Sequence, residues 1–439
     1  MSSRRVVVVG ASLAGLGAAR VLAEHVDEVV LIERDALPDG PVARRGVPQA
    51  RHLHNLLLRG VNELEALFPG FGADLYAAGA VPVDMLLQLK MLSIFGWFPR
   101  HPSEIVMPCC SRPLIEQVVR RRVRALPRIT WLEGHDVEGL ILNSEQVCGV
   151  RCRRREVRAG DALEIESLLV VDAGGRGSRL PGWLDGAGLA KPAVTEVNPF
   201  LGYATRIFCM PHSAPDWSAL VVRNPMPSSR GGAIMPREGG LWVATLFGFG
   251  RDYPPTDEAG FDAFARSLAD PGLHEALSAA EPVSDIAGYR QTTGRWRHFE
   301  HLSSWPAGYV ALGDAVCTFN PLYGQGMTVA MMGVAALRAL LTEQGVEPDL
   351  GGKLRQRVAR LLAAPWRIAT GEDYRYPGTE GPPRPWAARA AHWYGDRVVH
   401  AALRNPDVHT RWMRVVHMLD DPATLLAPGI LGPALSPLH

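Results

Sequence analysis

The chain has 439 residues, of which 47% are apolar and 21% are charged, and its formal net charge is +1. This length allows two or three domains, and the composition is ordinary for a soluble globular enzyme. The near-neutral charge excludes a general electrostatic attraction to nucleic acid or to an anionic membrane surface. We therefore expect neither as a partner.

The cysteines and the N-terminus favour a cytoplasmic protein. None of the six cysteines forms a C-x-x-C pair or a zinc-binding spacing, and the adjacent Cys109 and Cys110 are poorly placed to bond each other. We expect reduced thiols. The chain enters its first apolar run at Val6, which leaves no room for a signal peptide. No stretch reaches about 18 uninterrupted apolar residues, so no membrane span is expected.

The first informative stretch is VVVVGASLAGLGAARVLA, residues 6–23. Its four valines predict a strand buried on both faces of a parallel sheet, and the small residues from Ala14 predict a closely packed helix. Gly10, Ser12 and Gly15 occupy the marked positions of a G-x-G-x-x-G turn, with serine in the middle. Such a turn lets backbone approach a pyrophosphate, which the bare N–H groups of the helix start then hold. The alternative is a βαβ unit without a dinucleotide.

A second apolar strand is predicted over 28–32, and Glu33 follows it. A carboxylate at this spacing binds a ribose hydroxyl, and it favours an adenosine without a 2′-phosphate, as in FAD or NAD. From Arg51 the leucines recur at helical spacing, which predicts an amphipathic helix to Phe68. His52 and His54 near its start form an H-x-H pair, but no second ligand cluster supports a metal, so no metal is expected.

The middle of the chain alternates between strand and helix signals. Residues 81–108 suggest strand pairs of a second sheet, either as an apolar pocket wall or as plain core, and Ser111-Arg112-Pro113 begins a helix. Residues 129–171 predict three or four strands, the last of them buried and parallel to the first, followed by the glycine-rich turn 172–179. An antiparallel sheet is expected over 198–250, and a helical segment broken at Pro271-Gly272 over 257–280.

The third informative stretch is YVALGDAVCTFNPLYGQGMTVAMMGVAALRALL, residues 309–341. It predicts a strand, a glycine and an acid, a loop, and then a helix. Asp314 directly follows the buried strand, where a carboxylate can bind polyol hydroxyls. Gly324 to Thr328 again offers bare N–H groups at a helix start. From Pro365 onward the chain is expected to be helical and Trp-rich, with prolines between its segments.

These stretches together resemble the FAD-dependent aromatic hydroxylases, that is, the p-hydroxybenzoate-hydroxylase-like group A flavin monooxygenases. The matching motifs are Gly10-x-Ser12-x-x-Gly15 with Glu33, the Asp172–Arg179 segment in a D-x-x-G-R-x-S form, and Gly313-Asp314 with Pro321 and the Gly324-Gln325-Gly326 turn. The order and separation agree over roughly residues 1–345. Within the family, the GVPQARHLHNLLLRG, GDAVCTFNPLYGQGM and PWRIATGEDYRYP stretches look like a bacterial natural-product branch that includes polyketide epoxidases.

The resemblance implies a mixed α/β fold: a Rossmann-like FAD-binding domain, an inserted antiparallel-sheet substrate domain and a helical C-terminal cap. We expect the discontinuous FAD domain in 1–80, 105–197 and 285–345, the substrate sheet in 81–104 and 198–284, and the cap in 346–439. The oligomeric state is not readable. The implied FAD-binding residues, by backbone or side chain, are Gly10, Ser12, Leu13, Ala14, Gly15, Glu33, Arg34, Arg112, Val137, Asp314, Pro321, Gly324, Gln325, Gly326 and Met327.

Within that set the family implies separate roles. The glycine turn would hold the pyrophosphate, Glu33 the adenosine ribose and Asp314 the ribityl chain. Arg34 would lie over the adenine, and Val137 would contact it through backbone. Arg112 would contact the ribityl or phosphate region. Pro321 would lie near the reacting edge of the flavin, and the backbone of Gly324–Met327 would face its pyrimidine end. Asp172 would be structural or would assist NAD(P)H.

The implied activity is an NAD(P)H- and O2-dependent hydroxylation or epoxidation of an apolar small molecule, through a flavin C4a-hydroperoxide. No catalytic side chain is assigned. The alternatives are a FAD-bound non-redox cyclase of a polyketide pathway, a flavin halogenase and a flavin-dependent reductase. The Trp-x-Trp-x-Ile-Pro signature of halogenases is absent, and Lys90 has no convincing halogenase setting.

Overall fold

The computed structural model describes residues 4–144, 146–156, 162–189, 191–211 and 215–437. Its centre is a five-stranded parallel sheet in the order β19-β11-β1-β2-β7. Valines fill the middle strand, and Val6, Val7 and Val8 are fully buried, as a strand covered on both faces requires. The strands are β1 (Arg5–Val9), β2 (Glu28–Glu33), β7 (Ile129–Glu133), β11 (Leu169–Asp172) and β19 (Tyr309–Ala311).

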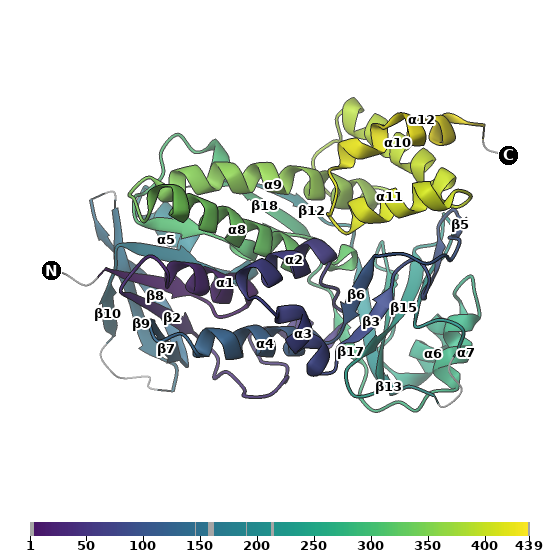
Figure 1. The fold of residues 1–439 in the computed structure, drawn as a ribbon, viewed down its shortest axis with the longest axis horizontal. Helices are drawn as coiled ribbons and strands as arrows, with labels where there is room; N and C mark the ends of the chain where they lie inside the picture. Colours follow the sequence, from purple (N-terminus) through teal and green to yellow (C-terminus); the bar gives the residue numbers. More distant parts are fainter. Residues whose placement is uncertain (1–3, 145, 157–161, 190, 212–214, 438–439) are drawn as a thin grey trace.

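Helices cover one face of this parallel sheet, and a small antiparallel sheet covers the other (Figure 1). The helix after the glycine turn packs beside the long apolar helix that follows the third motif. The helices of this layer are α1 (Leu13–Leu22), α4 (Arg112–Arg124) and α8 (Gly326–Gln344), with α2 (Leu58–Leu67) and α3 (Phe71–Ala77) beside them. The opposite layer holds β8 (His135–Asn143), β9 (Gln146–Arg154), β10 (Leu163–Glu166) and, against β8, α5 (Leu180–Gly186).

A second half of the molecule is built on a seven-stranded sheet in the order β17-β13-β16-β15-β14-β4-β5. Its pairs are antiparallel except β14 with β4, which run parallel. Helices α6 (Glu258–Arg266) and α7 (Gly272–Ser278) cover one face. The strands are β4 (Leu89–Ser93), β5 (Gly96–Trp97), β13 (Gly202–Cys209), β14 (Ala219–Arg223), β15 (Arg230–Arg237), β16 (Leu241–Gly248) and β17 (Ala287–Tyr289).

Short elements and a C-terminal set of helices complete the chain. In Figure 1 the first C-terminal helix, green, lies beside the apolar helix α8 of the FAD-binding half, and the last ones, yellow, lie above the second half. The remaining strands are β3 (Val81–Asp84) paired with β6 (Val106–Cys109), and β12 (Ala193–Val197), β18 (Gly294–His298) and β20 (Cys317–Thr318) in one sheet. The C-terminal helices are α9 (Leu350–Asp373), α10 (Trp386–Ala402), α11 (Pro406–Val416) and α12 (Pro428–Leu435). The 3-10 turns are η1 (Pro48–Arg51), η2 (Gly175–Gly177), η3 (Phe299–His301), η4 (Gly313–Ala315), η5 (Pro321–Tyr323) and η6 (Pro422–Leu426).

The mixed α/β class is confirmed, and so is the antiparallel sheet expected after residue 198. Two expectations were wrong in detail. The helix expected from Arg51 begins only at Leu58, because residues 52–57 run without regular structure across to the second half, where the ring of His52 meets Thr205. Between residues 129 and 172 there are five strands instead of three or four. The helical region expected from Pro365 onward is present, and its first helix, α9, already begins at Leu350.

One helix of the described ranges, α8, is long and apolar enough to cross a membrane by length and composition. Its best window has a mean hydropathy of 1.2, and 61% of that window is buried inside the fold. It packs against α1, α2 and α9, which is the environment of a core helix. All six cysteines lie in the described part, and all are free thiols there.

Candidate functional site

Three segments that are far apart in sequence meet at one edge of the parallel sheet. Strands β1, β11 and β19 are neighbours, and each ends in one of the three motifs. A Cβ added to Gly10 would lie 2.4 Å from the Ala173 oxygen, and one added to Gly313 would lie 3.0 Å from the Ala14 Cβ. The first motif therefore approaches both of the other motifs closely. The carboxyl edge of such a sheet is where α/β folds bind ligands.

The glycine turn has the geometry that phosphate binding needs. Gly10 has a φ of 99°, and a Cβ on Gly15 would lie 1.7 Å from the Gly10 oxygen, so neither position accepts a side chain. Ser12 is the N-cap residue of α1, but its side chain does not cap the helix. Its hydroxyl donates instead to Glu116 at 2.7 Å. The helix start therefore keeps its N–H groups for an anionic ligand.

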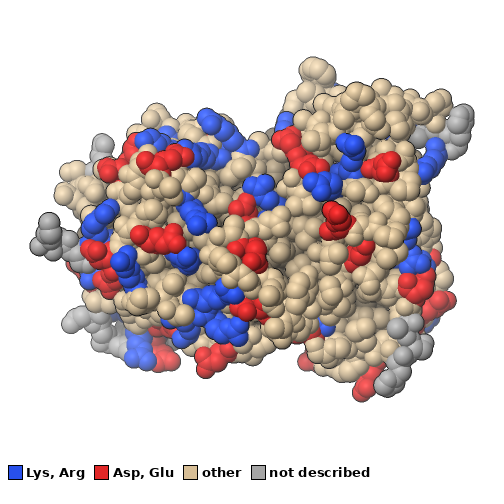
Figure 2. Space-filling model, in the orientation of Figure 1, with Lys and Arg blue, Asp and Glu red and all other residues tan. Residues whose placement is uncertain are grey.

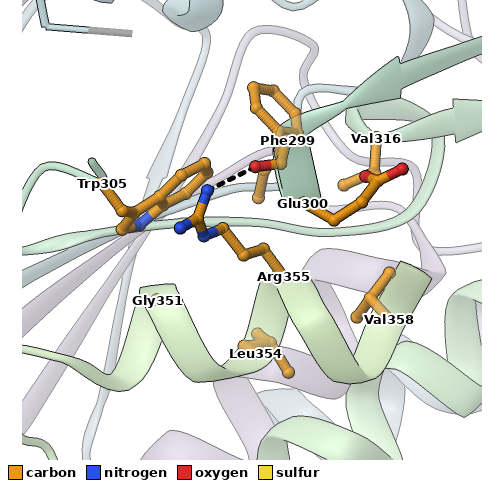
Figure 3. A pocket seen from close by; sticks show the side chains of 9 residues that line it. Phe299, Glu300, Trp305, Val316, Gly351, Leu354, Arg355 and Val358 are labelled. Atoms are coloured by element: carbon orange, nitrogen blue, oxygen red, sulfur yellow. Dashed lines mark hydrogen bonds between the residues drawn. The ribbon is translucent and has the colours of Figure 1, made fainter. Parts of the chain in front are cut away.

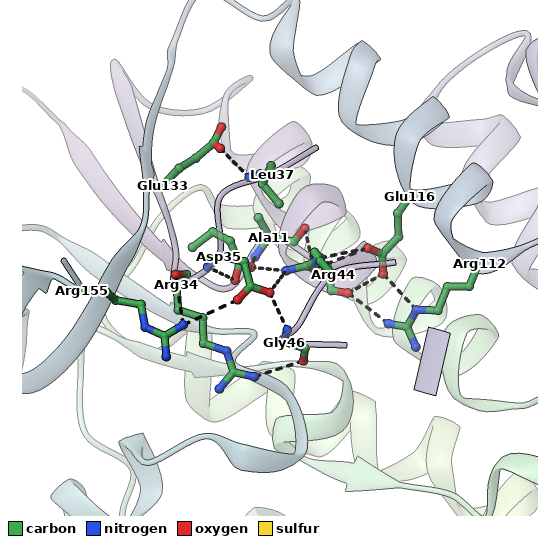
Figure 4. A network of polar contacts seen from close by, with 12 residues as sticks. Ala11, Arg34, Asp35, Leu37, Arg44, Gly46, Arg112, Glu116, Glu133 and Arg155 are labelled. Atoms are coloured by element: carbon green, nitrogen blue, oxygen red, sulfur yellow. Dashed lines mark hydrogen bonds and ion pairs between the residues drawn. The ribbon is translucent and has the colours of Figure 1, made fainter. Parts of the chain in front are cut away.

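A buried group of charges surrounds this turn, and we call it the glycine-turn cluster (Figure 4). Arg112 donates to Glu116 at 2.9 Å and to the Ser12 hydroxyl at 3.0 Å. Arg44 lies 2.9 Å from Glu33 and 3.4 Å from Glu116. The members are Ser12, Glu33, Asp35, Arg44, Arg112 and Glu116.

Electrostatics keep the cluster ionised. Burial alone would raise the pKa of Glu116, but the charges of Arg112 and Arg44 and the bonds from Ser12 and Arg112 lower it. Burial opposes the charge on Arg44, yet its carboxylate neighbours outweigh burial and raise its pKa. Sequence reasoning missed Arg44 and Glu116, because nothing in a proline-rich loop or on a helix face marked them as partners of the turn.

Glu33 lies where the ribose contact was expected, at the end of β2 beside the turn. It is 5% exposed and accepts hydrogen bonds from the amides of Ala11 at 2.8 Å and Asp35 at 3.1 Å. Arg34 is exposed and donates to the Gly46 carbonyl. The Val137 carbonyl accepts from Arg179 at 2.7 Å. The adenosine contacts of Glu33, Arg34 and Val137 stay predictions.

Asp172, in the second motif, has a structural role. It is completely buried, and it accepts from the Ser178 hydroxyl at 2.7 Å, from the Tyr309 hydroxyl at 3.0 Å and from the Gly174 amide at 3.0 Å. These bonds tie the end of β11 to β19 and to the following turn. With three donors already in place, the carboxylate braces this edge of the sheet.

Asp314, in the third motif, is free to take a ligand. It is half-buried and forms no hydrogen bond or ion pair with any described residue. Burial raises its pKa, and Arg112, Arg176 and Arg295 oppose that rise. At the neighbouring start of α8, the buried Gln325 Oε1 has no partner among the described atoms. Two acceptors without donors, at a helix start, fit a ligand that carries several hydroxyl groups.

A cleft of about 630 Å³ opens beside this region. His52 and Tyr289 form part of its wall, with ring centroids 5.2 Å apart. His52 Nδ1 lies 2.8 Å from the Thr205 hydroxyl, which in turn lies 2.7 Å from that of Thr245. Burial, with Arg51, lowers the pKa of His52 to about 4, so the ring is neutral at pH 7. Burial raises the pKa of Tyr289, with Asp314 adding to the rise and Arg176 and Arg112 opposing it.

Two further features were considered as sites. In the described ranges, two groups have metal-ligand spacing: His298, Glu300 and His301, and Glu372, His392 and Asp396. Neither contains His52 or His54, and Arg375 already pairs with Glu372 and Asp396 in the second group. A recess beside Arg355 and Trp305 has a volume of only about 10 Å³ (Figure 3). It holds at most one water molecule.

A family model described as a FAD binding domain matches residues 3–346. The chain belongs to this family. The expected kinship with the p-hydroxybenzoate-hydroxylase-like flavoproteins is thereby confirmed, and FAD is its cofactor. The matched range contains all three motifs and the cleft residues. FAD fits the residues present, since it supplies a pyrophosphate for the bare start of α1 and ribityl hydroxyls for Asp314.

Relatives with known names support the family. The chain is 33% identical to Protein Rv3254 of Mycobacterium tuberculosis, over 98% of this chain and 93% of that protein. Among solved structures, the myxobacterial chondrochloren halogenase CndH shares 18% identity, with a TM-score of 0.64 and coverage of 94% and 96%. PqsL of Pseudomonas aeruginosa, a probable FAD-dependent monooxygenase, shares 15%, with a TM-score of 0.63 and coverage of 85% and 98%. At these identities the two structures show the shared fold alone.

Proposed function

We propose that this protein is a FAD-dependent monooxygenase that uses NAD(P)H and O2 to hydroxylate or epoxidise an apolar, polyketide-like small molecule. The observation that carries the proposal is the cleft at the junction of the FAD-binding half and the seven-stranded sheet, lined by residues of the 43–52 segment and by β17. One side of this junction supplies Asp314 and the start of α8. The other supplies His52, which the sheet hydroxyl of Thr205 holds, and Tyr289 of β17.

The sheet face beyond the cleft suits an apolar substrate. Ile207, Val221, Met235 and Val243 pack there with side chains from the β3–β6 pair and from residues 53 and 58. Such a wall excludes water from the reacting atoms, which an oxygen transfer requires. The uncharged polar groups near it are His52, Tyr289 and the two threonine hydroxyls, and the cleft is also lined by Arg44, Arg45 and Arg51. They can orient one polar group of an otherwise apolar molecule.

The bound FAD supplies the hydride acceptance and the oxygen transfer. The chain's own residues bind and orient it. The start of α1 would hold the pyrophosphate, and Asp314 would accept hydrogen bonds from the ribityl hydroxyls. The positive end of the α8 dipole, at Gly324–Met327, would stabilise negative charge on the flavin ring. Arg112 is fixed by Glu116 and Ser12, so it presents its charge in one place.

A halogenase is less well supported by the side chains. Lys90 lies on β4, next to the end of the seven-stranded sheet, and its ammonium group is 4.8 Å from the centre of the Trp97 ring. This lysine is engaged away from the cleft, whose lining residues do not include it. The monooxygenase therefore remains the function that the site supports best.

The test is an anaerobic reduction. The purified FAD complex is mixed with NADH or NADPH, and bleaching of the flavin is followed for hours, with dithionite as the control for a reducible flavin. Bleaching followed by reoxidation with peroxide release in air is the expected result. A flavin that dithionite bleaches but neither nicotinamide reduces would overturn the proposal in favour of a non-redox cyclase.

A further inference from the structure

The loop that carries Pro321 is braced by a residue of the C-terminal region. Asp373 is the last residue of α9 and is 1% exposed. Its Oδ1 atom accepts a hydrogen bond of 2.6 Å from the Asn320 amide and one of 2.9 Å from the Tyr323 hydroxyl. These two donors are the N-cap residue and the last residue of the short turn η5 (Pro321–Tyr323). One carboxylate oxygen thus holds both ends of the turn.

Asn320 transmits this contact to the backbone. Its side-chain oxygen caps η5 by accepting from the Leu322 amide at 3.1 Å, and it also accepts from the Tyr203 hydroxyl at 3.4 Å. The amide can cap in this way only while its Nδ2 points toward Asp373. Without the carboxylate, the amide loses the partner that fixes its orientation. We call Tyr203, Asn320, Tyr323 and Asp373 the loop-support cluster.

We propose that Asp373 is a positioning residue that holds the Asn320–Gly326 loop in the conformation that meets the flavin, so that the C-terminal helical region is a working part of the cofactor site. The inference rests on the proposed function only for the position of the flavin ring. The bracing of the loop stands on contacts within the chain. The loop leads directly into Gly324, which has a φ of 65°, and then into the start of α8.

The charge of Asp373 is poised to change near neutral pH. Burial and the neighbouring Glu372 raise its pKa to about 7, against the lowering effect of the Asn320 and Tyr323 bonds and of Arg223. The ionisable groups around it are Glu372 and Tyr374 on its own helix, Tyr323 of η5, Arg223 of β14 and Tyr203 of β13. The tyrosines are neutral at pH 7, because Asp373 and burial raise the pKa values of all three. The hydrogen bonds that Asn320 and Tyr323 donate to Asp373 therefore strengthen as the pH rises through 7, because the acceptor becomes an anion.

The test compares three variants with the parent protein. Asp373→Ala removes both hydrogen bonds, Asp373→Asn keeps an acceptor but no charge, and Asp396→Asn is the matched control. Asp396 pairs with Arg375 in the same helical region and has no contact with the loop. The first measurement is hydrogen exchange of the peptide covering residues 320–326 in the FAD-free protein. The second is the visible absorption spectrum of the bound FAD between pH 5.5 and 8.5.

We expect exchange about tenfold faster in Asp373→Ala, largely rescued in Asp373→Asn and unchanged in Asp396→Asn. We expect the FAD spectrum to change with pH near 7 in the parent and to stay constant in Asp373→Asn. Loop exchange in Asp373→Ala equal to that of the parent, or an equal effect in Asp396→Asn, would overturn the proposal. If Asp373→Ala does not fold, Tyr323→Phe replaces it and should show part of the effect. The hydrogen-exchange measurement does not depend on FAD reduction. Its result can therefore contradict the role of Asp373 without contradicting the monooxygenase assignment.

Discussion

The molecule holds two buried carboxylate clusters beside its cofactor motifs, and they are built in opposite ways. The glycine-turn cluster surrounds its acids with arginines, so that Glu116 and Arg44 both remain charged. In the loop-support cluster, Asp373 has only neutral donors, and no described cation lies within ion-pair distance of it. The first arrangement is permanent at physiological pH, whereas the second titrates there. A cluster whose charges do not change near neutral pH suits the binding of a pyrophosphate. A carboxyl group that titrates near pH 7 suits a loop that is expected to lie near the reacting edge of the flavin.

The surface around the two clusters does not reproduce this contrast. On the face drawn in Figure 2, acidic and basic side chains alternate over the FAD-binding half, and no extended patch of one sign is visible on that face.

Removing the central cation should have the largest effect. Arg44→Met removes the cation that pairs with the buried Glu33 and leaves Glu116 with Arg112 as its remaining partner. We expect the free energy of unfolding of the FAD-free protein to fall by about 3 kcal/mol. Arg45→Met, at the exposed neighbouring position, should change it by less than about 0.5 kcal/mol. Denaturant unfolding measures both. Equal values for the two variants would show that Arg44 does not stabilise the cluster.

Placing an acid in the glycine turn should expel the cofactor. Ser12→Glu puts a carboxylate beside Glu116 and in the path of the pyrophosphate, so the Kd for FAD should rise at least about a hundredfold, or about 2.7 kcal/mol. Ser12→Ala, which removes only the hydroxyl, should retain FAD. Fluorescence titration gives both constants. A yellow, stoichiometric Ser12→Glu protein would exclude this turn as the pyrophosphate site.

Deleting the ribityl acceptor should have a smaller effect. Asp314→Ala removes the half-buried carboxylate that lacks a protein partner, and we expect the Kd for FAD to rise about tenfold, or about 1.4 kcal/mol. Asp349→Ala, at an exposed position near the start of α9, is the control. Full flavin occupancy in dilute Asp314→Ala protein would contradict the ribityl assignment.

The pH dependence of stability should have opposite signs for two neighbouring buried acids, Asp373 and Glu372. The pKa of Asp373 is about 7 in the folded protein and near 3.8 in the unfolded chain, so its stabilising contribution is complete below about pH 4 and is lost as the pH rises to 7. Asp373→Asn should therefore gain stability relative to the parent between pH 5 and pH 8, by an amount on the order of 1 kcal/mol.

The neighbouring Glu372 provides the contrast for that measurement. Burial would raise its pKa, but His392, Arg375 and Arg223 outweigh burial and lower it. Its contribution is therefore present at neutral pH and is lost on acidification. Glu372→Gln should lose stability relative to the parent at pH 8. The same sign of change in both variants would contradict the assigned charge states.

Much of the cofactor site was predictable because its motifs are local. Gly10 and Gly15 are required within one turn, and the strand, turn and helix around them follow from residues only a few positions apart. The same holds for Asp314 and the start of α8. The start of α2 was not predictable, because the leucines that follow Arg51 have helical spacing although the segment is extended. There a tertiary contact, His52 with Thr205, prevailed over the local pattern.

The sequence by itself determined the family, the parallel sheet and the three motifs that meet at one edge of this sheet, since each motif is written in contiguous residues. Only the tertiary structure decided which side chains support them. Ser12 meets Glu116 across 104 residues, and Asn320 meets Asp373 across 53. No periodicity links positions at such separations, because their proximity follows from how helices and sheets pack. Burial then set the charge state of Asp373, which depends on its surroundings in three dimensions.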